Sequence, residues 1–127
     1  MSKKPIKNLK EGDLVIIDNA PCKVESVSTT VSGKHGAAKT RVEAIGILDG
    51  KRRSIVMPAD EEIEVPIILR KKAQVLAIVE NKAQLMDLET YETLELEIPE
   101  EKIWKLKEGE ETYYYEIMGV KTLKELK

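Results

Sequence analysis

Short apolar or alternating runs, bounded by turn-forming residues, recur along the whole chain of 127 residues. The alternating run 42–48 ends at Asp49-Gly50, a dipeptide typical of hairpins. Runs of the same kind cover residues 14–17, 22–27, 54–57, 59–65, 75–79, 83–88, 93–98 and 111–120. Side chains that alternate with a period of two face opposite sides of a sheet. Strands that recur about every ten residues and are linked by turns predict an all-β fold made of small barrels.

One segment, residues 99–107, is predicted to form a short helix. It begins at Pro99, and Glu100 and Glu101 occupy the first turn, where the helix dipole favours negative charge. Gly109 would follow its end. The predicted inner face consists of Ile103, Trp104 and Leu106.

The length of the chain suits two small units, each of which would bury a lean core. We expect the boundary near residues 67–72, at the basic stretch Arg70-Lys71-Lys72. Residues 1–69 would then form an N-terminal barrel and residues 70–127 a C-terminal barrel.

The composition is that of a soluble globular protein, with 42% hydrophobic and 35% charged residues. The longest apolar run, residues 75–79, is far shorter than the ~20 residues that span a bilayer. The lysine-rich N-terminus lacks the apolar core of a secretory signal. We therefore expect a protein with no membrane segment.

The single cysteine, Cys22, cannot form an internal disulfide, which is typical of a reducing compartment. A cytoplasmic location follows as an expectation. Alternation predicts that Cys22, Val24 and Ser26 share one strand face, with Cys22 as a small buried residue.

Charge is distributed unevenly along the chain. Up to Pro58 there are 11 Lys and Arg against 6 Asp and Glu, a balance of +5; from Ala59 onward there are 10 against 17, a balance of −7. This asymmetry predicts that only the basic half approaches a polyanion directly.

The loop around Lys34 is the strongest candidate for a functional site. Lys34 lies in the sequence Ser32-Gly33-Lys34-His35-Gly36, within a stretch from residue 26 to residue 42 that contains no carboxylate. Glycine tolerates tight backbone turns, so the loop is expected to present the lysine outward. Lys39 and Arg41 are the other cations of this stretch and are candidate RNA contacts.

Enzymatic alternatives find little support in the sequence. A phosphate-binding loop requires a glycine five positions before its Gly-Lys and a Ser or Thr after it, whereas this chain has Ser28 and His35 there. His35 is the only histidine, so neither a metal site nor a Ser-His-Asp triad is expected, and no catalytic residue is assigned. The tyrosines Tyr113, Tyr114 and Tyr115 leave open a role in core packing or in RNA contact.

The loop resembles the modified loop of translation factor 5A, the archaeal and eukaryotic counterpart of bacterial elongation factor P. The resemblance rests on residues 28–41, above all on the core Gly33-Lys34-His35-Gly36 followed by Ala38-Lys39. It continues through residues 65–68, 74–78 and 84–93 and covers nearly the whole chain. The short length and the lack of a long N-terminal extension are typical of archaeal members. Val31 departs from the lysine that many relatives carry.

The resemblance implies that deoxyhypusine synthase transfers the aminobutyl group of spermidine to Lys34, and that a hydroxylase completes hypusine where it is present. The residues expected to be recognised with Lys34 are Ser32, Gly33, His35, Gly36, Ala37, Ala38 and Lys39. No cofactor or metal is implied, because spermidine is only the donor for the modification.

The resemblance also implies an SH3-like domain over residues 1–69 and an oligonucleotide-binding (OB) fold over residues 70–127. Family members bind the ribosome beside peptidyl-tRNA, as monomers in our expectation, and promote the first peptide bond and synthesis at stalled proline-rich sequences. A general RNA-binding protein that uses the basic half and the barrel tyrosines is the alternative, and a nucleotide-dependent enzyme is a more distant one.

Overall fold

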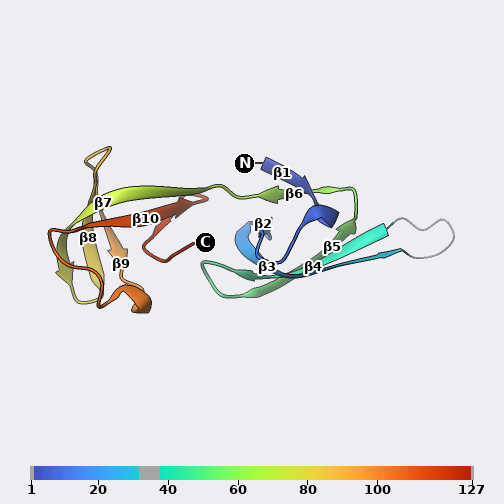
Figure 1. The fold of residues 1–127 in the computed structure, drawn as a ribbon, viewed down its shortest axis with the longest axis horizontal. Helices are drawn as coiled ribbons and strands as arrows, with labels where there is room; N and C mark the ends of the chain where they lie inside the picture. Colours follow the sequence, from blue (N-terminus) through green and yellow to red (C-terminus); the bar gives the residue numbers. More distant parts are fainter. Residues whose placement is uncertain (1, 32–37, 127) are drawn as a thin grey trace. The chain divides into compact units, whose positions relative to one another are not determined.

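The computed structural model describes residues 2–31 and 38–126, which divide into two compact units, Met1–Ile67 and Ile68–Lys127 (Figure 1). The boundary predicted from the sequence lies between residues 69 and 70. The one helix predicted from sequence, over residues 99–107, does not form, and both units are built mainly from strands.

The first unit contains six strands and a 3₁₀ turn, η1 (Ile6–Asn8). The strands are β1 (Ser2–Pro5), β2 (Leu14–Ile17), β3 (Ala20–Val31), β4 (Ala38–Gly46), β5 (Arg52–Pro58) and β6 (Glu62–Val65). Strands β2 to β5 form an antiparallel sheet in chain order, and β1 pairs with β6. This SH3-like arrangement was expected, whereas a strand β1 in the lysine-rich N-terminus was not.

Alternate side chains along the strands point inward and form the core of the first unit. Thr40, Val42 and Ala44 are buried, whereas Lys39, Arg41 and Glu43, which alternate with them, are exposed. Cys22 is fully buried, as predicted, and burial raises the pKa of its thiol. The core residues are Ile6, Leu9, Val15, Ile17, Cys22, Val24, Val42, Ala44 and Ile63.

A β-bulge in β3 corrects one expectation from the sequence. The pairing of β3 with β4 shifts between Val24 and Ser26, so that Ser26 lies opposite Glu43. The extra residue, Glu25, reverses the alternation, because two residues of β3 then face one of β4. Ser26 is therefore exposed and does not share the buried face of Cys22 and Val24.

The second unit contains five strands and a 3₁₀ turn, η2 (Glu100–Lys102). The strands are β7 (Ile68–Val79), β8 (Lys82–Asp87), β9 (Thr93–Glu97), β10 (Glu111–Ile117) and β11 (Val120–Thr122). Their order in the sheet is β11-β10-β7-β8-β9, and β11 also contacts β9, which nearly closes an OB-type barrel. Its core residues are Ala73, Val75, Ala83, Leu85, Ile98, Leu106, Tyr114 and Leu123.

The helix predicted over residues 99–107 is only the three-residue turn η2. Of the three residues assigned to its inner face, Leu106 alone is buried; Ile103 is exposed, and Trp104 is 90% exposed. A helix this short is marginal without an apolar face to pack, and one buried leucine does not provide it.

Candidate functional site

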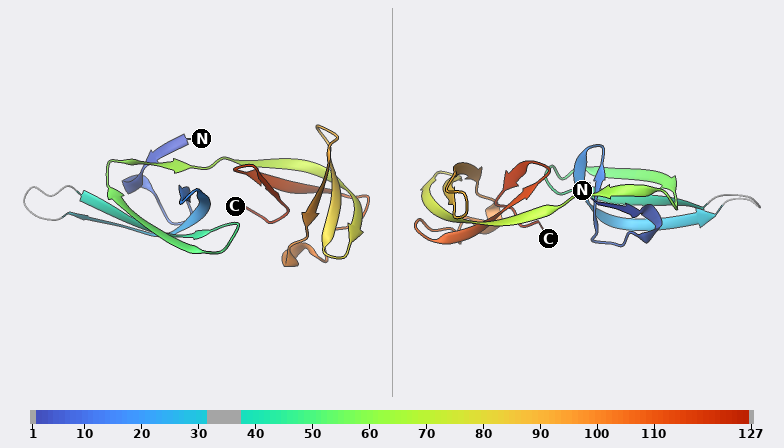
Figure 2. Two further views of the ribbon diagram at one scale, coloured as in Figure 1. Left: turned by 180° about the vertical axis from the view of Figure 1, so that it is seen from behind. Right: turned by 90° about the horizontal axis from the view of Figure 1, so that it is seen from above.

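The β3–β4 hairpin places both described ends of the predicted modification loop side by side (Figure 2). Pairing continues to the last described residues, Val31 opposite Ala38. Six predicted site residues therefore lie outside the described residues: Ser32, Gly33, Lys34, His35, Gly36 and Ala37. Ala38, Lys39 and Arg41 belong to β4.

Contacts on both sides of β4 hold the base of this hairpin. The side-chain oxygens of Thr29 and Thr40 are 2.9 Å apart and share a hydrogen bond across β3 and β4, and Thr40 is fully buried. On the other side, the backbone N–H of Ala59 donates to the carbonyl oxygen of Ala38 at 2.9 Å. The stem is thus hydrogen-bonded up to the residue that follows the loop.

Lys39 and Arg41 project from the outer, solvent-facing side of β4. Lys39 lies opposite Thr30 of β3, and Arg41 lies opposite Ser28. Neither hydroxyl side chain brings a negative charge, and Lys39 forms no ion pair with any described residue. The end of the stem nearest the loop therefore presents cations and hydroxyl groups together.

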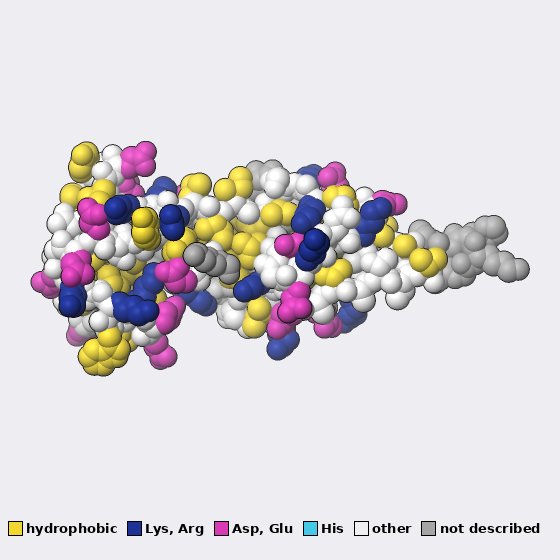
Figure 3. Space-filling view, viewed as in Figure 1, with side chains coloured by type: hydrophobic (Ala, Val, Ile, Leu, Met, Phe, Trp, Pro, Cys, Tyr) yellow, Lys and Arg dark blue, Asp and Glu magenta, His cyan; other side chains and the backbone are white. Residues whose placement is uncertain are grey.

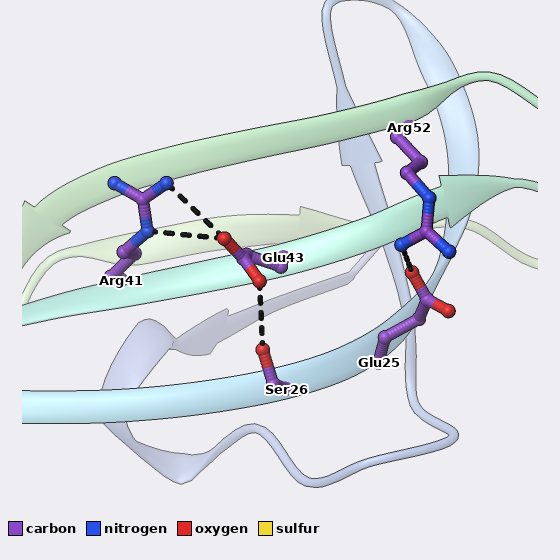
Figure 4. A network of polar contacts seen from close by, with 5 residues as sticks. All are labelled: Glu25, Ser26, Arg41, Glu43 and Arg52. Atoms are coloured by element: carbon purple, nitrogen blue, oxygen red, sulfur yellow. Dashed lines mark hydrogen bonds and ion pairs between the residues drawn. The ribbon is translucent and has the colours of Figure 1, made fainter.

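The carboxylates closest to this stem are both bound by arginines (Figure 4). The Arg41 guanidinium donates to Glu43 at 3.2 and 3.4 Å, and the Ser26 hydroxyl donates to the same carboxylate at 3.4 Å. Arg52 donates to Glu25 at 2.7 Å. On this outer face the exposed cations are Lys23, Lys39, Arg41 and Arg52, and the carboxylates are Glu25, Glu43 and, beside Lys23, Glu11. The face is net positive, as contact with a polyanion requires.

The three consecutive tyrosines of β10 have different environments. Tyr114 lies in the core of the second unit and donates its hydroxyl to the buried carboxylate of Asp87. The Tyr115 hydroxyl donates to Glu125 at 2.6 Å. Tyr113 is 41% exposed, but the guanidinium of Arg70 lies 4.4 Å from its ring centroid. Core packing, one of the two roles left open from sequence, is therefore confirmed for Tyr114.

The hydrogen bond from Tyr114 lowers the pKa of Asp87 from 3.8 to about 2, with further contributions from the backbone N–H groups of Thr90 and Glu89. Burial, together with the negative charge of Asp87, raises the pKa of Tyr114 well above its usual range. This pair anchors the turn between β8 and β9.

The outer face of β8 and β9 carries few features of an RNA-binding surface. Its exposed residues include Gln84 on β8 and Thr93, Glu95 and Glu97 on β9. No described aromatic side chain lies on these two strands, and the carboxylates would repel a phosphate backbone. Hydrophobic side chains elsewhere on the second unit stand among charged ones (Figure 3).

Two negative findings apply to the described residues. They contain no group of three or more His, Cys, Asp or Glu side chains arranged to hold a metal ion. Over residues 2–31 and 38–126, no helix has the length and apolar character needed to cross a membrane.

The fold and the hairpin define an all-β protein of two small barrels, the first of which carries a long basic hairpin. Residues 3–61 match the family described as "Translation initiation factor 5A-like, N-terminal". The chain is 50% identical to translation initiation factor 5A of Archaeoglobus fulgidus over 95% of this chain and 94% of that protein. It is 56% identical to translation initiation factor 5A of Methanocella arvoryzae, over 90% and 89% of the two chains.

A solved structure shows the same similarity. Eukaryotic translation initiation factor 5A from Methanococcus jannaschii superimposes with a TM-score of 0.81 at 46% identity, covering 94% of this chain and 90% of that one. The chain therefore belongs to the translation initiation factor 5A family and is a translation factor, as the resemblance predicted.

Sequence reasoning missed the Thr29–Thr40 pair that locks the stem. A signal was present, because the two threonines stand at equal separation from the ends of the six-residue segment 32–37. Any symmetric hairpin centred on that segment brings them opposite each other.

Proposed function

We propose that this protein binds the ribosome beside peptidyl-tRNA and promotes peptide-bond formation, at the first bond and at stalled proline-rich sequences, through a hypusine or deoxyhypusine arm on Lys34. The proposed modifying partner is deoxyhypusine synthase, with spermidine as the donor of the aminobutyl group. The proposed location is the cytoplasm, and the proposed form on the ribosome is a monomer.

The observation that carries this proposal is the hydrogen-bonded stem that ends at Val31 and Ala38. It fixes both ends of the segment that contains the lysine, and a rigid scaffold is the usual support for a functional loop. A net positive outer face next to that segment suits an approach to tRNA or ribosomal RNA.

The chemistry of lysine supports the proposed role of the arm. A lysine side chain is a compact charge on a flexible stem, and an added aminobutyl group lengthens it and supplies a second cationic nitrogen. Contacts from such nitrogens to sugar and phosphate position an RNA without reading its sequence. A factor that serves every aminoacyl-tRNA requires this lack of sequence preference.

Catalysis would remain with the ribosome. The arm would hold the acceptor end of the tRNA in a productive orientation, and orientation of reactants alone has large effects on rate. We accordingly predict that the isolated protein catalyses no reaction and needs no cofactor.

The alternative, a general RNA-binding protein, has weaker support. It requires aromatic platforms on an RNA-accessible face, yet Tyr114 and Tyr115 are buried and Arg70 already stacks on Tyr113. Binding of arbitrary single strands that is indifferent to Lys34 modification would favour it.

Substitution of Lys34 by arginine tests the proposal. Arginine keeps the charge but cannot accept the aminobutyl arm, so Lys34→Arg should reduce stimulation of proline-proline synthesis by at least about tenfold, because a positioning contact is lost. The measurement is the rate of synthesis on a proline-rich message with ribosomes, using protein made in cells that contain the modifying enzyme. Lys121→Arg, on exposed β11, is the matched control and should retain full stimulation. Full activity of the Lys34 variant would refute the assigned mechanism.

A further inference from the structure

The turn between β8 and β9 presents an exposed aromatic residue in an unusual backbone conformation. Tyr91 is 71% exposed and has a φ of 62°. Bulky residues rarely adopt positive φ, because the side chain then crowds the backbone, and such outliers cluster at functional positions. Figure 1 shows this turn extending away from the strands that it joins.

Asp87 holds the turn in this conformation. The buried carboxylate accepts hydrogen bonds from the backbone N–H groups of Glu89 and Thr90, at 2.8 and 2.9 Å, and from the Tyr114 hydroxyl. The backbone N–H of Tyr91 donates to the Asp87 carbonyl at 2.8 Å, and the Asp87 N–H donates to the Glu92 carbonyl at 2.8 Å. The aromatic ring is therefore kept at the surface by a rigid turn that the core anchors.

The surroundings of Tyr91 are acidic. Residues 87–97 contain Asp87 and four glutamates, Glu89, Glu92, Glu95 and Glu97, and no lysine or arginine. Neither Glu89 nor Glu92 forms a salt bridge with a described residue, whereas Glu95 pairs loosely with Lys82 at 3.6 Å. An incoming cation would thus meet carboxylates that have no strong partner within the described chain.

A hollow of about 410 Å³ lies over strands β7, β8 and β9 and begins at Thr93, the first residue after the turn. It is lined by Leu76, Gln84, Thr93, Leu94 and Glu95. Thr93 lies two residues after Tyr91, and exposed Leu76 supplies an apolar wall. Such a site accommodates the aliphatic stem of a lysine or arginine whose charged end reaches a carboxylate.

We propose that Tyr91, Glu89, Glu92 and this hollow form a docking surface for a protein segment that carries arginine or lysine. The tyrosine ring offers a face for a cation, and the carboxylates offer ion pairs. An RNA partner is disfavoured because its phosphates would face these carboxylates. The surface is chemically the opposite of the β3–β4 hairpin, and its role does not depend on modification of Lys34.

A titration of the full chain, followed by NMR, tests this surface with two probes. One probe is an arginine-glycine repeat peptide, and the other is an oligouridylate with the same number of charges. The peptide should shift the ring signals of Tyr91 and the amide signals of Glu89 and Glu92, and the RNA should leave them unchanged. Larger shifts at Tyr91 with the RNA, or no shift with the peptide, would overturn the proposal.

Two variants separate binding from folding. Asparagine tolerates positive φ, so Tyr91→Asn should keep the fold while weakening peptide binding by about tenfold. The double variant E89Q/E92Q should weaken peptide binding and flatten its salt dependence. Val31→Asn, also at a 71% exposed apolar position, is the control and should change peptide affinity less than about twofold. Unchanged affinity in both Tyr91→Asn and E89Q/E92Q would contradict the proposal.

Discussion

The β3–β4 hairpin and the β8–β9 turn each connect two antiparallel strands, but the exposed charges of the hairpin are mainly positive and those of the turn are negative. The described end of the first carries Lys39 and Arg41 beside hydroxyl side chains. The second carries Glu89 and Glu92 beside an exposed tyrosine. Within one small chain, therefore, the exposed charges of one region favour contact with a polyanion and those of the other oppose it.

The two units also contain different polar anchors, a partly exposed ion pair in the first and a buried pair in the second. In the first unit, Asp49 pairs with Arg53 through two hydrogen bonds of 3.1 and 2.8 Å, packed against Gly46 at the end of β4. The guanidinium holds the pKa of Asp49 well below its usual range. In the second unit, Asp87 pairs with Tyr114 beneath the turn. Removing each anchor should therefore damage one region and spare the other.

A modest effect on stability is expected at Gly46, in the first unit. A Cβ there would collide with the Asp49 carboxylate and would lie 2.7 Å from Nη1 of Arg53. Both groups are the free ends of flexible side chains that can move aside, so Gly46→Ala should break the Asp49–Arg53 pair and lower the free energy of unfolding of the first unit only modestly. Hydrogen exchange resolved by residue measures this, with faster exchange in β3 and β4 and little change in β8.

A double variant tests whether the collision with Asp49 causes the loss of stability in Gly46→Ala. If the collision with Asp49 is responsible, the double variant G46A/D49A should lose less stability than the two single variants together. Additive losses would contradict this explanation.

A larger effect, in the other unit, is expected at Tyr114. Tyr114→Phe removes a hydrogen bond to a buried carboxylate and should cost about 2 kcal/mol. Loosening should concentrate in the β8–β9 turn and leave the β3–β4 stem unchanged, which residue-resolved hydrogen exchange would detect. Equal loosening of both regions would contradict the claim that the Tyr114–Asp87 pair stabilises the β8–β9 turn alone.

The Asp87 pKa predicts how this anchor responds to acid. Because the folded pKa is lowered to about 2 from 3.8, the stabilisation is fully present above pH 3.8 and is lost as pH falls toward 2. Acid titration should loosen the β8–β9 turn in this window, and Asp87→Asn should remove that pH dependence.

The smallest effect is expected for a single charge on the hairpin. Lys39→Gln should weaken binding to ribosomal RNA uniformly across sequences and reduce the slope of log affinity against log salt by about one. Filter binding over a range of salt concentrations measures this. Lys121→Gln in the second unit should leave the slope unchanged. An equal change of slope in both variants would contradict a specific contact between the hairpin and RNA.

Much of the fold was predictable because strands and hairpins follow from local patterns. Alternation over residues 42–48 identified the buried face of β4, and Asp49-Gly50 marked the end of its hairpin, where Gly50 has a φ of 71°. The two barrels followed from the spacing of such runs together with the family resemblance. The sequence placed the candidate loop between strands predicted over residues 22–27 and 42–48, and the structure extends these strands to Val31 and back to Ala38.

Features that depend on distant contacts were not predictable. β1 forms because Ser2–Pro5 pairs with β6, about 60 residues away in the chain. The local sequence of a strand does not identify so distant a partner. The segment 99–107 has helix-favouring ends, but tertiary packing buries only Leu106 and leaves Trp104 at the surface. The bulge at Glu25 and the Thr29–Thr40 bond likewise emerge only once β3 and β4 are paired.

The most direct test of the central claim is the intact mass of the protein purified from its native cells, followed by fragmentation to locate any addition. We predict one aminobutyl or hydroxylated aminobutyl group, carried on Lys34 and on no other lysine. Native protein that is wholly unmodified at Lys34 would contradict the proposed mechanism.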